Sequence, residues 1–210
     1  MKIWDWPTRL FHWLLVVLIP LQWWTAENDL MDLHMLAGIG IAALLLFRLI
    51  WGLIGSSTAR FANFVRGPRA VVSYLNGRAA HVLGHNPLGG WSVVTMLALL
   101  SAQVGLGLFA SDEDGLNSGP LSNLISYEAS ECAGEIHEQL FNVILILIAL
   151  HVAAIIAYAL FRRQNLVRPM LIGSGEGPEG AEPMRAAGAG RLAVAVLIAA
   201  AAAWWLFSRL

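Results

Sequence analysis

The chain has 210 residues, of which 58% are hydrophobic and 13% are charged. Soluble domains carry roughly 25% charged residues, so this composition excludes a disordered chain, argues against nucleic-acid binding and indicates an integral membrane protein. The 13 basic residues nearly balance the 14 acidic ones, and the single cysteine, Cys132, excludes an intrachain disulfide and an all-cysteine metal site.

Five apolar stretches are candidates for membrane-spanning helices, which take roughly 20 residues. In chain order they are 10–24, 33–54, 91–110, 140–161 and 192–207. We expect Asp5 to cap the first helix and Pro7 to lie in its first turn. The fifth stretch is short, but Arg191 and Arg209 flank it, where their side chains can reach the two membrane interfaces. The sequence predicts an all-α membrane protein with a four-helix transmembrane bundle and a fifth, C-terminal transmembrane helix.

Two longer segments connect these stretches. Segment 55–90 carries four arginines and has room for a surface helix near 70–75. Segment 173–190 is rich in Gly, Pro, Glu and Ala, a composition typical of a flexible linker. We therefore divide the chain into a transmembrane core at 1–170, a flexible linker at 171–190 and an additional transmembrane helix at 191–210.

The distribution of charge along the chain predicts its orientation. The loops at 25–33 and 111–136 contain no Lys or Arg, whereas the N-terminus, the loop after the second helix and the segment after residue 161 contain nearly all of them. Because cytoplasmic loops carry an excess of Lys and Arg, we expect a cytoplasmic N-terminus. Five helices then leave the C-terminus outside.

Ten acidic residues lie outside in this topology, almost without basic neighbours. They are Glu27, Asp29, Asp32, Asp112, Glu113, Asp114, Glu128, Glu131, Glu135 and Glu138. Such a surface attracts a basic protein, for example a lysine-rich c-type cytochrome. A solvated loop that only sets the topology is the alternative interpretation.

Four histidines lie in or at the edge of the predicted helices. His137 and His151 are 14 residues apart, which is about 21 Å along one helix and about 40° around it, so both rings leave the same face. The predicted depths pair His34 with His137 near the outside and His12 with His151 near the cytoplasm. Two opposed imidazoles at one depth are an axial pair for a haem iron, so the sequence predicts two haems. For a single membrane histidine, a packing residue or a proton relay is the alternative.

Small residues follow these histidines along the helices. Gly38 comes one helical turn after His34, where it leaves room for a flat macrocycle, and Gly105 and Gly107 offer the same room on the third helix. Close packing of neighbouring helices is the alternative role for such glycines.

Two arginines are candidates for contacts with haem propionates. Arg9 lies one turn before His12, and Arg48 lies 14 residues after His34, so it is expected at the inner depth. An arginine within a membrane needs an anionic partner. A side chain that reaches the interface is the alternative for Arg48.

His81 and His85 precede the third helix in a stretch that Gly84 and Pro87 interrupt. We interpret this stretch as a solvated loop. A proton entry point or a propionate contact is the alternative, and it makes His85 a candidate cofactor-binding residue.

Several motifs together resemble a known family. In chain order they are 4–13 (WDWPTRLFHW), 34–38 (HMLAG), 47–52 (FRLIWG), 84–91 (GHNPLGGW), 137–138 (HE) and His151. Their order and spacing resemble the prokaryotic cytochrome b561 family, which includes the b-type cytochrome subunits of nickel-iron hydrogenases. The resemblance covers roughly residues 3–170.

The resemblance implies a four-helix core in a bacterial inner membrane, with two b-type haems whose ligands fall on His12, His34, His137 and His151. The leading hypothesis is a di-haem cytochrome that transfers electrons across the membrane between a quinone or redox-protein partner and a second partner, a periplasmic c-type cytochrome or an oxidoreductase subunit. The alternative is a quinone oxidoreductase, the membrane subunit of a hydrogenase-like or dehydrogenase-like complex, in which His85 or a nearby carboxylate handles quinone protons. A haem-free anchor or transporter is a third hypothesis. The linker and fifth helix depart from the simplest family members and leave two roles open, oligomerisation or docking of a specific partner.

Overall fold

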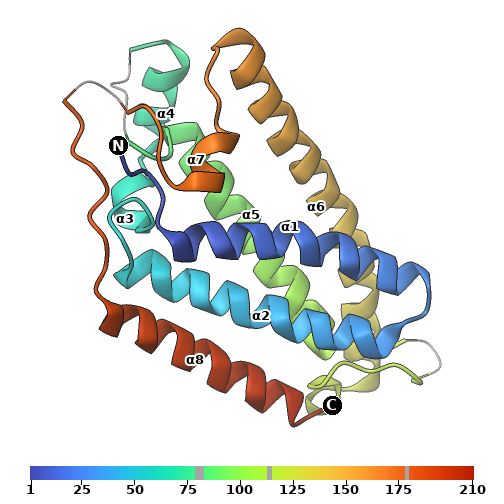
Figure 1. The fold of residues 1–210 in the computed structure, drawn as a ribbon. Helices are drawn as coiled ribbons and strands as arrows, with labels where there is room; N and C mark the ends of the chain where they lie inside the picture. The colour runs from blue at the N-terminus through green and yellow to red at the C-terminus, as the bar shows by residue number, and fades with distance from the viewer. Residues whose placement is uncertain (79–82, 113–114, 178–179) are drawn as a thin grey trace. The chain divides into compact units, whose positions relative to one another are not determined.

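The computed structural model describes residues 1–78, 83–112, 115–177 and 180–210, so His81, Glu113 and Asp114 lie outside it. The described residues form helices and two isolated β-bridges but no strand, which confirms the predicted all-α class. Figure 1 shows the helices α1 (Trp6–Glu27), α2 (Met31–Ile54), α3 (Phe61–Phe64), α4 (Pro68–Leu75), α5 (Pro87–Phe109), α6 (Tyr127–Phe161), α7 (Val167–Ile172) and α8 (Ala189–Phe207), with a 3-10 turn, η1 (Ser122–Leu124), between α5 and α6.

Four helices of the described residues are long and apolar enough to cross a membrane, namely α2, α5, α6 and α8. The 22-residue helix α1 is not among them. Its polar and charged side chains, chiefly Arg9, His12, Gln22 and Glu27, lower its mean hydropathy although its length is sufficient. The structure therefore supports four candidate spans, and the five-span topology stays a prediction.

The chain divides into two compact units. The first consists of Met1–His12, Arg48–Met96 and Ala149–Ala195, and the second of Trp13–Phe47, Leu97–Ile148 and Val196–Leu210. Each unit holds two of the four helical histidines. His12 and His151 belong to the first unit, and His34 and His137 belong to the second.

The two units carry opposite charge. The residue ranges of the second unit contain the ten acidic residues named above and one basic residue, Arg209. The ranges of the first unit contain the other 12 basic residues against four acidic ones, Asp5, Glu176, Glu179 and Glu182. The charge separation found along the sequence therefore follows the structural division.

Asp5 fixes the beginning of α1 in the first unit. Its Oδ1 accepts a hydrogen bond from the backbone N–H of Thr8 at 2.9 Å, as an N-cap residue does, and this confirms the expected cap. Its Oδ2 accepts a second bond from Trp51 Nε1 on α2 at 2.8 Å. Asp5 and Trp51 are both buried, so one carboxylate both caps α1 and joins it to α2.

Segment 173–188, which its composition predicts to be a flexible linker, makes backbone hydrogen bonds to other parts of the first unit. Gly173 ends α7 with a left-handed φ of +80°, a conformation that favours glycine. Its carbonyl accepts bonds from the N–H groups of Ile3 at 2.8 Å and Trp4 at 3.2 Å. Further along, the N–H of Ser57 donates to the carbonyl of Arg185 at 3.0 Å. The described residues of the segment form no helix before α8, and several of them are hydrogen-bonded to residues distant in the sequence.

In the second unit, α8 packs on the other helices through a small apolar cluster. Leu206 of α8 is buried with Ile39 of α2 and Leu121, and Leu108 and Phe109 of α5 pack against them. The C-terminal half of α8 is therefore part of the core of the second unit.

Candidate haem sites

The first unit brings His12 and His151 together. His12 comes from α1 and His151 from α6, and their ring centroids are 6.4 Å apart with the ring planes tilted by 54°. In the second unit, His34 of α2 faces His137 of α6 with a centroid separation of 6.2 Å and an angle of 75°. The four histidines thus form two pairs, each within one unit, in the combinations predicted from depth.

The spacing of each pair fits two axial ligands of one iron. A ring nitrogen of an imidazole ligand lies about 2 Å from its metal ion and the ring centroid about 1 Å further, so two imidazoles on opposite sides of one iron have centroids about 6 Å apart. In the described residues no group of three or more His, Cys, Asp or Glu side chains gathers as a metal site would require. The donor sets are therefore pairs of imidazoles, which suit a haem better than a free metal ion.

Both histidines of the second unit are held by hydrogen bonds at Nδ1. His137 Nδ1 lies 2.8 Å from the carbonyl oxygen of Gln103 on α5, and His34 Nδ1 lies 3.1 Å from the carbonyl oxygen of Gln22 on α1. An Nδ1–H that donates to a carbonyl leaves Nε2 as the ligating nitrogen and fixes the orientation of the ring. Thr25 Oγ1 adds a contact to His34 Nδ1 at 3.3 Å.

The glycines near this pair differ in what surrounds them. A Cβ at Gly107 would lie 2.8 Å from Cε1 of His137, so Gly107 makes room for the imidazole ring itself. A Cβ at Gly38 would lie 3.1 Å from Gln22 Nε2. Nothing lies within 4 Å of the corresponding position at Gly105. Gly107 therefore has a defined steric role beside a candidate ligand.

A family model agrees with this geometry. The model of the prokaryotic cytochrome b561 family matches residues 3–173, a range that contains both histidine pairs. The chain belongs to the prokaryotic cytochrome b561 family. No curated protein and no solved structure matched the chain. Family membership makes this protein a b-type cytochrome of membrane electron transfer that binds b-type haem.

Two arginines of this b561-family chain have nitrogen atoms without a hydrogen-bond partner in the first unit. Arg48 is 2% exposed, its guanidinium lies 5.0 Å from the centroid of the Phe61 ring, and its Nη1 makes no hydrogen bond among the described residues. Arg9 donates from Nη1 to the carbonyl of Leu171, while its Nε has no such partner. A buried guanidinium requires an anionic partner, and a haem propionate is a group of that kind.

His85 is not the solvated loop residue that the sequence indicated. Its ring lies between Trp4 and Phe64, at centroid distances of 4.6 and 4.7 Å. Burial, and then the proximity of Arg48 and His151, lowers the pKa of His85 to about 3. The solvated-loop interpretation is therefore wrong for His85, and its neutral ring belongs to the surroundings of the first pair.

The structure also joins three polar residues that the sequence analysis did not select. The hydroxyl groups of Tyr74 on α4 and Tyr158 on α6 are hydrogen-bonded to each other, and Asn86 Nδ2 donates to them at 3.0 and 2.9 Å. Burial, followed by the hydrogen bond to Tyr158, raises the pKa of Tyr74 to about 12. Tyr158 comes seven residues after His151, two helical turns along the same face, and that spacing was the available signal.

Proposed function

We propose that this protein is a di-haem b-type cytochrome of a bacterial inner membrane. It would transfer electrons across the membrane between a quinone or redox-protein partner and a second partner, a c-type cytochrome or an oxidoreductase subunit. The observation that supports the proposal is the presence of two histidine pairs. Their ring centroids are 6.4 Å apart in the first unit and 6.2 Å apart in the second. Bound haem supplies an iron that gains and loses one electron.

The chain's own residues would hold and tune the two groups. His12 with His151 would hold one haem iron, and His34 with His137 would hold the other. The carbonyls of Gln22 and Gln103 orient the rings of the second pair, and such hydrogen bonds increase the basicity of a ligating imidazole.

The residues of the first unit would bind the propionates of its haem. Arg48 and Arg9 offer unpartnered guanidinium nitrogens, and His85 offers an Nδ1 without a partner among the described residues. Gly38 keeps the space beside α1 free of a side chain in the second unit. These contacts extend the proposed site beyond its four ligands.

Haem content tests the proposal. We expect the purified protein to contain two b-type haems per chain, with a reduced-minus-oxidised spectrum of six-coordinate low-spin iron. One haem per chain, or none, would contradict it. A haem-free anchor or transporter would be the correct interpretation if the protein folds and lacks a Soret band.

The acidic surface of the second unit supports a basic redox partner. Six of its acidic side chains are exposed, and none of the six forms an ion pair within the described residues: Glu27, Asp29, Asp32, Glu128, Glu135 and Glu138. We propose that this surface faces the periplasm, with the N-terminus cytoplasmic and α8 as a fifth span, and that a c-type cytochrome with surface lysines docks on it.

A second candidate function, quinone oxidoreductase, is supported by the Tyr74, Asn86 and Tyr158 cluster. The two phenols have two hydroxyl hydrogens and share one hydrogen bond, and both also accept from Asn86 Nδ2. One phenol hydrogen is therefore left to donate outward, and a quinone carbonyl is a suitable acceptor. His85 is packed between two aromatic rings, so the tyrosines are better placed to handle quinone protons.

Single substitutions distinguish this second function. If it is correct, Tyr158→Phe slows quinone-dependent reoxidation of the reduced protein without changing its haem spectrum, because the phenol contacts no ligand histidine in this cluster. An unchanged rate in Tyr158→Phe and Tyr74→Phe, or no reaction with any quinone, would exclude it.

A further inference from the structure

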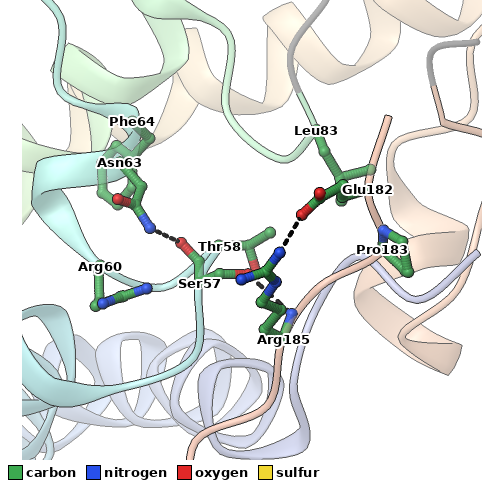
Figure 2. A pocket seen from close by; sticks show the side chains of 9 residues that line it. All are labelled: Ser57, Thr58, Arg60, Asn63, Phe64, Leu83, Glu182, Pro183 and Arg185. Carbon is green, nitrogen blue, oxygen red and sulfur yellow. Dashed lines mark hydrogen bonds and ion pairs between the residues drawn. The ribbon is translucent and has the colours of Figure 1, made fainter. Parts of the chain in front are cut away.

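A cavity of about 310 Å³ lies in the first unit, and none of the four paired histidines lines it (Figure 2). One side is formed by the residues after α2, including Ser57, Arg60 and Asn63, and the other by residues 182–185. Pockets for small molecules have volumes of roughly 300–1,000 Å³, so the cavity is at the lower end of that range.

The cavity walls are fixed by hydrogen bonds between segments distant in the sequence. The N–H of Ser57 donates to the carbonyl of Arg185 at 3.0 Å, and the N–H of Arg185 donates to Ser57 Oγ at 2.9 Å. Asn63 Nδ2 donates to the carbonyl of Ser57 at 2.6 Å, as Figure 2 shows. These bonds hold both sides of the cavity in a defined position.

The charged side chains of the lining have a positive excess. Two arginines, Arg60 and Arg185, face one carboxylate, Glu182. Arg60 Nε is buried and makes no hydrogen bond among the described residues. Arg185 pairs with Glu182 at 2.6 Å, but these side chains are 77% and 74% exposed, and such exposed pairs contribute little. Among the described residues Arg60 Nε therefore has no hydrogen-bond partner, and Arg185 can exchange its exposed partner at low cost.

Part of the cavity lining lies outside the range that the family model matches. The family model matches residues 3–173, whereas Glu182, Pro183 and Arg185 follow that range. One wall is therefore supplied by a segment that the family model does not include. Phe64 and Leu83 add apolar surface to the lining.

We propose that this cavity binds a phosphate group, with Arg60 and Arg185 as its ligands. The planar guanidinium fork matches phosphate geometry through two parallel hydrogen bonds, which explains the choice of phosphate over a halide. The group belongs either to the headgroup of an anionic phospholipid, whose acyl part would meet the apolar wall, or to a soluble phosphate. The proposal does not depend on the haem sites.

Two binding measurements on the purified holoprotein test the proposal and distinguish the sources. Native mass spectrometry measures retention of added phosphatidylglycerol against phosphatidylcholine. Thermal unfolding measures stabilisation by inorganic phosphate against chloride at equal ionic strength. Both are repeated with Arg60→Gln, Arg185→Gln and the charge-keeping Arg60→Lys. The matched control is Arg69→Gln, since Arg69 is exposed on α4 nearby and does not line the cavity.

We expect saturable binding in at least one measurement, weakened about tenfold or more in Arg60→Gln and Arg185→Gln, less in Arg60→Lys, and unchanged in Arg69→Gln. Binding of phosphatidylglycerol alone identifies a lipid headgroup, and binding of inorganic phosphate identifies a soluble phosphate. The proposal is overturned if neither ligand binds in a way that Arg60→Gln weakens. It is also overturned if Arg69→Gln weakens binding equally, because diffuse surface charge would then explain the result.

Discussion

Gly105 and Gly107 lie on the same helix, α5, but only Gly107 is next to the ring of His137. A Cβ at Gly107 would approach His137 Cε1 to 2.8 Å and Nδ1 to 3.0 Å, whereas the position at Gly105 is open. The His137 ring is also held by the carbonyl of Gln103 at 2.8 Å. Because that bond restrains the ring, it cannot move away from an added methyl group without losing its orientation.

We therefore predict that Gly107→Ala alters the haem that we propose for His34 and His137. The expected result is a shifted absorption band or midpoint potential for one haem, or its loss, measured by spectroscopic redox titration. Gly105→Ala is the matched control, since it adds the same methyl group to the same helix in open space and should stabilise α5 by up to about 1 kcal/mol. Equal spectra for Gly107→Ala and the parent protein would show that the ring does not need this space.

Arg48 provides a second prediction for a single residue. If Arg48 contacts a haem propionate as proposed, removing its buried positive charge disfavours the reduced iron. Arg48→Gln should then lower the midpoint potential of one haem by on the order of 60 mV, a tenfold change in a one-electron equilibrium. The haem of the other unit should keep its potential. Equal shifts of both haems, or none, would argue against a propionate contact at Arg48.

The helix α6 illustrates how far single elements can be predicted from the sequence. Its apolar part was predicted from residue 140, but the helix begins at Tyr127. Glu128, Glu131, Glu135 and Glu138 recur at three- and four-residue spacing, a helical period that a search for uncharged stretches passes over. The sequence is sufficient to predict that His137 and His151 share one helix face, because both lie on the same helix. The contact of Tyr74 with Tyr158 was not, since 84 residues separate them and only the packing of α4 beside α6 joins them.

The beginning of α1 depends on Asp5, and this gives a prediction for an element. Asp5→Ala removes the N-cap of α1 and the acceptor of Trp51 Nε1, so it should lower the free energy of unfolding by about 2–4 kcal/mol. Thermal denaturation followed by circular dichroism measures the loss. Asp5→Asn keeps a capping oxygen and should cost less. Equal midpoints for Asp5→Ala and the parent protein would contradict the role of this carboxylate.

In the whole molecule, 13 basic residues nearly balance 14 acidic ones, but the two kinds of charge lie mostly in different units. The second unit holds one basic residue, and the first holds four acidic ones. Counting the charged residues in each predicted loop is sufficient to predict this separation, because the count does not depend on how the helices pack. The pairing of segment 173–188 with the N-terminal residues needed the structure, since Gly-rich composition does not specify a partner.

The exposed acidic residues of the second unit predict a salt-dependent reaction. Electron exchange with a lysine-rich c-type cytochrome should slow steeply as ionic strength rises, because surface charges are screened beyond about 10 Å at 0.1 M salt. Stopped-flow absorbance measures the rate. The combined substitution Glu135→Gln and Glu138→Gln should flatten the salt dependence, and an acidic cytochrome serves as control. A rate independent of salt would exclude electrostatic docking at this surface.

We propose that each unit holds one haem between its own two histidines. This arrangement is tested most directly by reduced-minus-oxidised spectra and haem content of His12→Ala and His34→Ala, compared with His151→Ala and His137→Ala. We predict that His12→Ala and His151→Ala perturb one haem and that His34→Ala and His137→Ala perturb the other. Alteration of the same haem by His12→Ala and His34→Ala would contradict this arrangement.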